Sequence, residues 1–284
     1  MKTTIAYRDY EWPDGVRLQL GRRTLIMGIL NITPDSFSDG GRYTAVESAV
    51  EQARRMVEAG ADLIDIGGES TRPGSEPVSL EEELRRVVPV IEALRAELPE
   101  LPLSIDTYKA ETARQALTAG AHIINDIWGL KGDDQMARVA AESGCPVILS
   151  HNRLARDYEA LVPDVIADLR ESVRLARTAG VAESHIWLDP GIGFAKTYED
   201  NVALMGALDQ LTALGYPVLL GTSRKRFIQQ TLGRPAGEVV MGTAATVVMG
   251  IMQGCQLMRV HDVAEMSQAA RMADRIVYSD ASQM

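Results

Sequence analysis

The sequence has few cysteines, few aromatic residues and no long apolar run. Its two cysteines, Cys145 and Cys255, form no CxxC motif, so neither a disulfide framework nor a cysteine-based zinc site is expected. We expect both to be small core residues in a reducing compartment, which favours the cytoplasm. The longest apolar stretch, AATVVMGIM at 244–252, is far shorter than the ~18 residues that a membrane helix needs. The opening stretch, MKTTIAYRDYEWPDG, has no apolar core and does not predict a signal peptide.

An excess of positive charge is also absent. The formal net charge is −10, whereas a surface for nucleic acid or for an anionic membrane needs a basic face. We therefore expect neither partner, and an anionic substrate would need cations gathered locally. By contrast, 46% of the 284 residues are hydrophobic, which is ample for a large buried core.

A repeated pattern predicts the architecture. Six times a helix-like stretch ends at a glycine, and a nearly continuous apolar strand follows. Glycine in the left-handed conformation commonly ends a helix, and strands that are apolar throughout are typical of a parallel sheet buried on both faces. The six glycines are Gly60, Gly120, Gly144, Gly180, Gly215 and Gly254.

Two further strands, LIMGIL at 25–30 and LPLSIDT at 101–107, bring the expected strands to eight. Eight βα units in a chain of this length predict an α/β fold, a single (β/α)8 TIM barrel. A doubly wound open sheet is the alternative, but it usually has fewer strands. We expect residues 1–24 to form a β-hairpin extension that covers the lower end of the barrel, and residues 25–284 to form the barrel itself.

Polar side chains end every expected strand. In barrels of this kind the active site lies at the carboxyl ends of the strands, and an unpaired buried polar group costs about 1–3 kcal/mol. So many polar strand ends on one rim therefore indicate a functional site. The acceptors and donors suited to a flat heterocycle are Asp106, Asn125 and Asp189, and the cations suited to a phosphorylated ligand are Arg72, Lys225, Arg259 and His261.

The histidines and lysines divide between the two ends of the barrel. His122 and His185 begin strands and are expected to be structural, whereas His151 and His261 end strands. Of the five lysines, Lys225 alone lies just beyond an expected strand end. No two His, Cys or acidic residues have zinc-type spacing, so a dedicated transition-metal site is not expected. The residues alone predict an enzyme that binds a polar aromatic ring and phosphate.

Seven motifs stand in order, each at its place in the expected barrel: GILNITPDSFSDGG, DIGGESTRPGS, SIDT, INDI, LDPGIGF, GTSRK and RVHDV. From about Leu25 to the C-terminus the sequence strongly resembles the dihydropteroate synthase family. The resemblance implies a transferase of folate biosynthesis, and a homodimer. Its reaction would join 6-hydroxymethyl-7,8-dihydropterin diphosphate to p-aminobenzoate and release pyrophosphate.

Two alternatives of other classes stay open. A pterin-binding methyltransferase domain acting with a corrinoid protein shares the barrel and the Asp–Asn–Asp pterin edge, but it does not need NITPDSFSDGG and STRPGS. A non-catalytic pterin carrier would have the same pocket without turnover. Product formation from purified protein distinguishes all three.

The resemblance also implies roles for individual residues. Ile127 and Phe194 would line the pterin slot, although plain core packing explains them equally well. Arg259 would stack on the ring face. The residues that would hold the pterin edge are Asp106, Asn125, Asp189 and Lys225.

The diphosphate and the second substrate would lie beside the pterin. By resemblance, Asn31 would coordinate Mg²⁺, and Arg259 and His261 would hold pyrophosphate. Pyrophosphate would leave first, and the carboxylates of Asp106 and Asp35 would stabilise the pterin-methyl cation. The residues that would shape the p-aminobenzoate site are Thr71, Arg72, Pro73 and Arg226.

The polar segment after the first strand is long for a strand-to-helix connection, since ~2–6 residues suffice. We expect this segment, which ends in Gly40 and Gly41, to close over the bound pyrophosphate as a lid. Two positions depart from the common family pattern. Ser150 stands where many members have methionine, and Arg226 stands where many have serine, so both bear on substrate affinity.

Overall fold

The computed structural model describes residues 5–32, 42–69 and 77–278. Eight parallel strands follow one another in the order β8-β7-β6-β5-β4-β3-β10-β9. A bridge between Leu188 and Val218 joins the two ends of this row, so the sheet closes into a barrel. The strands are β3 (Leu25–Asn31), β4 (Leu63–Gly67), β5 (Leu103–Asp106), β6 (Ile123–Asp126), β7 (Val147–Ser150), β8 (Ile186–Asp189), β9 (Leu219–Leu220) and β10 (Leu257–Val260).

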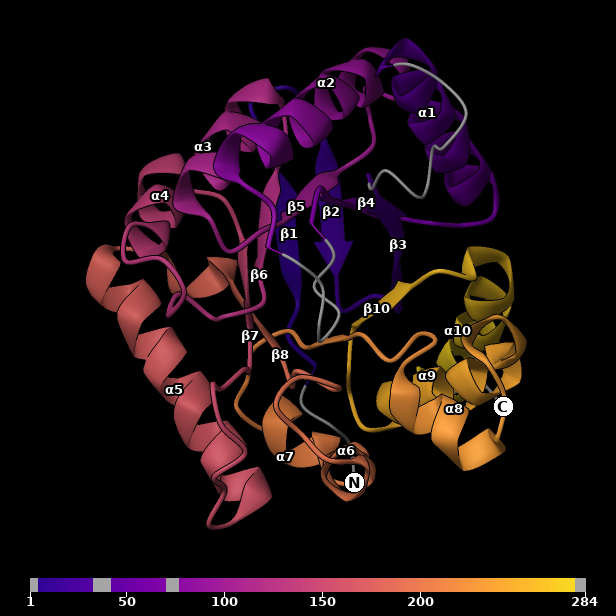
Figure 1. The fold of residues 1–284 in the computed structure, drawn as a ribbon. Coiled ribbons are helices and arrows are strands. Elements are labelled where there is room, and N and C mark those ends of the chain that lie inside the picture. Colours follow the sequence, from indigo (N-terminus) through magenta and orange to yellow (C-terminus); the bar gives the residue numbers. More distant parts are fainter. Residues whose placement is uncertain (1–4, 33–41, 70–76, 279–284) are drawn as a thin grey trace.

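The helices form a ring around the strands in chain order (Figure 1). This arrangement confirms the predicted (β/α)8 barrel and excludes the open doubly wound sheet. The helices are α1 (Arg42–Glu58), α2 (Leu80–Glu97), α3 (Ala110–Ala119), α4 (Met136–Ser143), α5 (Leu161–Ala179), α6 (Tyr198–Met205), α7 (Leu208–Thr212), α8 (Arg226–Leu232), α9 (Val240–Met252) and α10 (Val263–Val277).

Glycine ends the helices where the sequence predicted it. Gly120, for example, has φ of 113° and donates its N–H to the carbonyl oxygens of Ala116 and Leu117 at the end of α3. A side chain there would be strained by this backbone conformation. The other five predicted glycines, Gly60, Gly144, Gly180, Gly215 and Gly254, also have positive φ.

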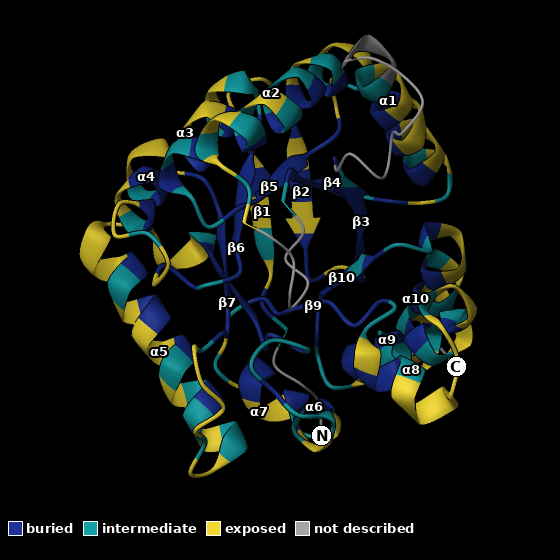
Figure 2. Cartoon of the chain, in the orientation of Figure 1, coloured by how far each residue is buried: buried dark blue, intermediate teal, exposed yellow. Residues whose placement is uncertain are grey.

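Burial explains why these segments form strands. The barrel strands are almost entirely buried, and the helices alternate between a buried inner face and an exposed outer face (Figure 2). Strand residues that are buried on both faces favour a parallel sheet covered by helices. Both cysteines lie in this core, as predicted.

The predicted N-terminal hairpin is present, as the antiparallel strands β1 (Arg8–Glu11) and β2 (Arg17–Leu20). Its Tyr10 and Leu18 pack against barrel residues such as Leu63 and Trp187 in one apolar cluster. Tyr10 donates its hydroxyl to the carbonyl oxygen of Ser184 at 2.6 Å and accepts from Trp187 Nε1 at 2.8 Å. These partners lie at the start of β8, so the hairpin closes the amino end of the barrel.

His122, at the start of β6, has the structural role that its position predicted. Its Nδ1 accepts from the Leu103 amide at 3.0 Å, and its Nε2 lies 3.0 Å from a carboxylate oxygen of Asp14. Burial lowers its pKa, so the imidazole is neutral at neutral pH. The described helices include none that is long and apolar enough to cross a membrane.

Candidate active site

Four side chains from four strands meet inside the carboxyl half of the barrel. Arg259 on β10 donates from Nε to Asp65 Oδ2 and from Nη2 to Asp106 Oδ2, each at 2.6 Å. Asn125 on β6 donates from Nδ2 to Asp65 Oδ2 at 3.0 Å. Because a carboxylate only accepts, this contact fixes the amide orientation and leaves Asn125 Oδ1 available as an acceptor.

Three acceptor atoms of this group lack a hydrogen-bond partner among the described residues. They are Asp65 Oδ1, Asp106 Oδ1 and Asn125 Oδ1, and all are buried. An unsatisfied buried acceptor costs about 1–3 kcal/mol, and native proteins rarely leave several together. A ligand that presents a row of N–H donors satisfies such a set.

Burial sets the protonation of Asp106. It raises the pKa of that carboxyl to about 7, against the opposing effect of the Arg259 cation, while the nearby Asp65 raises it further. The group therefore has one cation for two acids, and its charge responds to pH near neutrality.

A second cluster lies at the ends of β8 and β9. Asp189 Oδ1 accepts from the Gly191 amide at 2.6 Å, and the Lys225 ammonium lies 4.8 Å from the centre of the Phe194 ring. Lys225 also donates to the carbonyl oxygen of Ile192. Burial lowers the pKa of Lys225 to about 8, while Asp189 raises it. Burial raises the pKa of Asp189, and the positive charges of Lys225 and Arg259 oppose that shift. Arg259 of the first cluster therefore interacts electrostatically with Asp189 of the second.

The loop that carries Lys225 contains a residue in an uncommon backbone conformation and is held by contacts to the end of β10. Arg224 has φ of 58°, an uncommon conformation for a residue with a side chain. Its guanidinium forms an ion pair with Asp262, with 3.0 Å between Nε and Oδ2. On the same side, Ser223 Oγ accepts from the His261 amide at 3.1 Å and lies 3.0 Å from His261 Nδ1. These contacts join the loop after β9 to the end of β10.

Asn31 ends β3, beside the Arg259 strand. A side chain added at Gly67 would lie 3.6 Å from Asn31 Oδ1 and 3.6 Å from the Asp106 Cβ. Glycine at this position therefore keeps space open between the two residues. Within the described ranges, no cluster of three or more His, Cys, Asp or Glu residues could hold a metal ion.

The other predicted site residues have different placements. Ile127 is buried just after β6, and Arg226 is exposed at the start of α8. Ser150 is buried and pairs in register with Asp189 on the neighbouring strand. The predicted residues that lie outside the described ranges are Asp35, Thr71, Arg72 and Pro73, together with the predicted lid.

The sequence-based prediction gave no role to two residues that the structure places in or beside the site, although Asp65 was one of the polar residues at the strand ends. Asp65 holds both Arg259 and Asn125, and an acid in the middle of an apolar strand was the signal for it. Lys196 was omitted because only Lys225 was considered to lie at a strand end. In the structure Lys196 lies in the loop after β8, where it is buried and contacts His151, and no local pattern indicated this contact.

The barrel and the acceptors at its carboxyl end define a class of enzyme that binds a flat, donor-rich ring. The sequence model described as pterin binding enzyme matches residues 27–261. A dihydropteroate synthase of Bacillus subtilis (strain 168) is 56% identical over 260 residues, which is 92% of this chain and 91% of the relative. The chain belongs to the dihydropteroate synthase family of transferases. This finding confirms the main interpretation and not the methyltransferase alternative.

Solved structures agree with this assignment. The dihydropteroate synthase of Clostridium difficile, determined in the presence of pteroic acid, has a TM-score of 0.88 and 47% identity over 90% of this chain and 98% of that chain. The Xanthomonas albilineans enzyme with 4-aminobenzoic acid has a TM-score of 0.89 and 45% identity over 94% of this chain and 97% of that chain. The same enzyme in complex with 7,8-dihydropteroate has a TM-score of 0.86 and 43% identity over 94% of this chain and 98% of that chain.

Proposed function

We propose that this chain joins 6-hydroxymethyl-7,8-dihydropterin diphosphate to p-aminobenzoate, and that the pterin lies on the barrel axis above Asp65. The observation that carries this proposal is the set of orphaned acceptors at Asp106 and Asn125. The amino group and ring N–H groups of a pterin are donors along one flat edge. They match acceptors that lie on neighbouring strands, since Asp106 and Asn125 are paired in register on β5 and β6.

The remaining pterin contacts follow from the second cluster. Asp189 retains acceptor capacity beyond its bond to the Gly191 amide, so it serves a further ring donor. Lys225 supplies the donor for ring acceptors. The edge of the Arg259 guanidinium is held by two carboxylates, which leaves its planar face for stacking on the ring. The half-buried Phe194 covers the slot from the side of Lys225.

Asn31 fits a magnesium site of the kind that binds diphosphate. Mg²⁺ keeps several waters and usually takes one or two protein oxygens together with substrate phosphates. Asn31 Oδ1 is such an oxygen, and Gly67 leaves the space beside it open. When bound, Mg²⁺ neutralises charge on the leaving diphosphate. Arg259 lies on the adjacent strand β10 and His261 directly follows it, and the motif resemblance assigns both to the pyrophosphate.

The chain's own groups account for the remaining chemistry. The departure of diphosphate leaves positive charge on the pterin methyl carbon, and the carboxylates of Asp106 and Asp65 stabilise that charge. The arylamine nitrogen is neutral at pH 7, so its attack needs no strong base. This explains a site built of acceptors and cations. The proposed p-aminobenzoate contacts at Thr71, Arg72 and Pro73, and the proposed role of Asp35, rest on the motif resemblance.

Product analysis of the purified protein tests the proposal. We expect dihydropteroate and pyrophosphate in equal amounts when both substrates and Mg²⁺ are supplied, and no product when p-aminobenzoate is withheld. Pterin diphosphate binding without product would favour a pterin carrier. Methyl transfer to a corrinoid protein in place of condensation would favour the methyltransferase. A catalytically impaired Asp189→Asn variant, prepared in parallel, controls for a contaminating synthase.

We also propose a homodimer in the cytoplasm. The outer faces of α9 and α10 carry large apolar side chains that are mostly exposed, including Met241 at 80%, Met252 at 61% and Met272 at 64%. Contiguous exposed apolar surface on a soluble protein commonly marks an interface. We expect a dimer in sedimentation experiments and a monomer for Met241→Glu combined with Met252→Glu. A wild type that sediments as a monomer, with no change in the double variant, would contradict the proposed dimer.

A further inference from the structure

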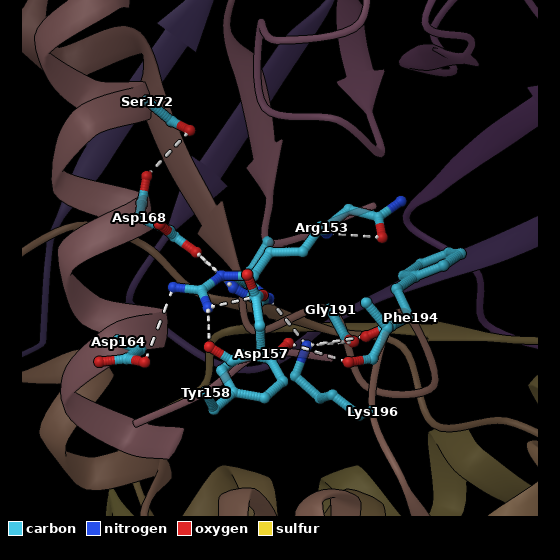
Figure 3. Close-up of polar contacts among 12 residues, drawn as sticks. Arg153, Asp157, Tyr158, Asp164, Asp168, Ser172, Gly191, Phe194 and Lys196 are labelled. Atoms are coloured by element: carbon cyan, nitrogen blue, oxygen red, sulfur yellow. Dashed lines mark hydrogen bonds and ion pairs between the residues drawn. The ribbon is translucent and has the colours of Figure 1, made fainter. Parts of the chain in front are cut away.

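Lys196 is a buried lysine next to the proposed pterin site. Only 5% of it is exposed. Its Nζ lies 2.8 Å from His151 Nδ1, 3.0 Å from the carbonyl oxygen of Gly191 and 3.1 Å from that of Phe194. Figure 3 shows the Lys196 side chain pointing toward Gly191 and Phe194, which precede it in the same loop. All three N–H bonds of an ammonium therefore have a protein acceptor.

The partners of His151 fix where its proton lies. Its Nε2 is 3.0 Å from Asp168 Oδ2, and the same oxygen accepts from Arg153 Nε at 2.6 Å. A carboxylate paired with arginine is ionised and accepts only, so Nε2 carries hydrogen and Nδ1 accepts from Lys196. The third proton of the Lys196 ammonium thus lies between the amine and the imidazole, and with it all three acceptors are paired. A neutral amine has only two N–H bonds, so loss of this proton leaves one of the three acceptors unpaired.

The turn that Lys196 holds is the one that arranges the second cluster of the site. The Gly191 amide donates to Asp189 Oδ1, and the Phe194 amide donates back to the Gly191 carbonyl oxygen at 3.0 Å. The Phe194 ring in turn lies beneath the Lys225 ammonium. Gly191 has φ of 68°, and a Cβ there would lie 1.8 Å from the His151 carbonyl oxygen. The turn is therefore closely packed against His151, and Lys196 bonds both of its ends.

We infer that Lys196 is a positioning residue for pterin binding, which shares one proton with His151 and thereby fixes the turn from Gly191 to Phe194, so that pterin affinity falls when this proton is lost. The inference rests on the proposed pterin site and states that the Lys196 proton controls the pterin affinity of that site. Neither Lys196 nor His151 is required to touch the pterin. The effect passes through the Gly191 amide to Asp189 and through the Phe194 ring to Lys225.

The surrounding charges place this proton loss within the working range of the enzyme. Burial lowers the pKa of Lys196 to about 7, and it lowers the pKa of His151 to about 3. The bridging proton is therefore held below about pH 7 and lost as the pH rises through it. The groups that face the pair are Asp189 on β8, Asp200 on α6, Asp168 on α5, Lys225 after β9, Arg153 and Tyr158 after β7, and Lys131 after β6.

A Lys196 variant and a matched surface variant test the positioning role. Pteroic acid affinity is measured by calorimetry for the wild type, Lys196→Met and Arg138→Met at about pH 6 and about pH 9, on either side of the lysine pKa. We expect Lys196→Met to bind about tenfold more weakly than the wild type at the lower pH and to show less loss at the higher pH. Arg138 is an exposed cation on α4 that pairs with Glu142 and is not among the groups that face the pair, so Arg138→Met should follow the wild type. Equal affinity of Lys196→Met and wild type at both pH values would overturn the inference.

An Asp168→Asn variant keeps the inference testable if Lys196→Met does not fold. The amide oxygen still accepts from His151 and Arg153, but the negative charge that raises the pKa of both Lys196 and His151 is gone. We expect the pH at which pteroic acid affinity is half lost to move downward, with the KM of the pterin diphosphate rising and that of p-aminobenzoate unchanged. A merely structural Lys196 predicts no movement of the midpoint, which would overturn the inference. A wild type that binds no pteroic acid at any pH would instead contradict the pterin site itself.

Discussion

Arg259 on β10 and Asp106 on β5 form an ion pair across the inside of the barrel, with 2.6 Å between Nη2 and Oδ2. The same guanidinium binds Asp65 on β4. Both carboxylates are almost fully buried, with side-chain exposures of 4% for Asp106 and 0% for Asp65. One cation therefore compensates two buried acids. Both the stability of the barrel and the proposed chemistry depend on Arg259.

Replacing this cation should destabilise the fold. We expect Arg259→Met to lower the free energy of unfolding by ~3–5 kcal/mol, because it removes the cation that both buried carboxyls, Asp65 and Asp106, are bonded to. Urea unfolding measures the change. Arg226→Met removes an exposed arginine from the start of α8 and should stay within ~0.5 kcal/mol of the wild type. A triple variant that also carries Asp65→Asn and Asp106→Asn should recover much of the loss, and no recovery would show that Arg259 stabilises by packing alone.

The raised pKa of Asp106 predicts how stability depends on pH. Burial raises this pKa to about 7, whereas an aspartate in an unfolded chain titrates near ~3.9. Between these values the folded state binds more protons than the unfolded state, so this carboxyl makes stability fall as the pH rises and has no further effect above about 7. Urea unfolding at a series of pH values should show a smaller decline for Asp106→Asn. Asp209→Asn, an exposed change on α7, should keep the wild-type decline.

Most of the fold could be predicted because its signals are local. The apolar strands and the glycines with positive φ, such as Gly60 and Gly254, each depend on a few neighbouring residues. The polar strand ends also predicted which end of the barrel carries the site. Asp106, Asn125 and Arg259 then meet because parallel strands bring their carboxyl ends together.

The unpredicted features depend on contacts between distant parts of the chain. Asp65 lies within its strand, and its role appears only when β10 and β6 bring Arg259 and Asn125 to it. Lys196 lies after β8 and acts through His151, which follows β7, so spacing along the chain contains no sign of the pair. The ion pair between Arg224 and Asp262 is of the same kind.

The proposed role of Asn31 can be tested without measuring turnover. We expect Asn31→Ala to weaken Mg²⁺-dependent binding of pyrophosphate by about tenfold, since it removes the proposed protein ligand of the ion. Calorimetry with pyrophosphate, with and without Mg²⁺, measures the effect. Pteroic acid carries no diphosphate, so its affinity should be unchanged in the same variant. Unaltered Mg²⁺-dependent pyrophosphate binding would remove Asn31 from the metal site.

Asp189→Asn should abolish useful pterin binding. The amide replaces one acceptor with a donor that faces a ring donor, and the loss of a charge-assisted hydrogen bond costs ~1.5–3 kcal/mol. Pteroic acid affinity measured by calorimetry should therefore fall about tenfold or more. The exposed Asp209→Asn is the matched control, because it makes the same chemical change on α7. Wild-type affinity in Asp189→Asn would exclude this carboxylate from the pterin edge.

The hairpin at the opposite end separates stability from function. Tyr10→Phe removes the hydroxyl that accepts from the fully buried Trp187 Nε1 and donates to the Ser184 carbonyl oxygen. We expect the free energy of unfolding to fall by ~1–3 kcal/mol, the penalty for an unsatisfied buried donor. Tyr7 is 63% exposed, so Tyr7→Phe should change stability by no more than ~0.5 kcal/mol. Pteroic acid affinity and turnover should be preserved in both variants, because the site lies at the carboxyl ends of the strands and the hairpin closes the amino ends. If Tyr10→Phe kept its stability but lost pteroic acid affinity, the two ends of the barrel would not divide stability and binding in this way.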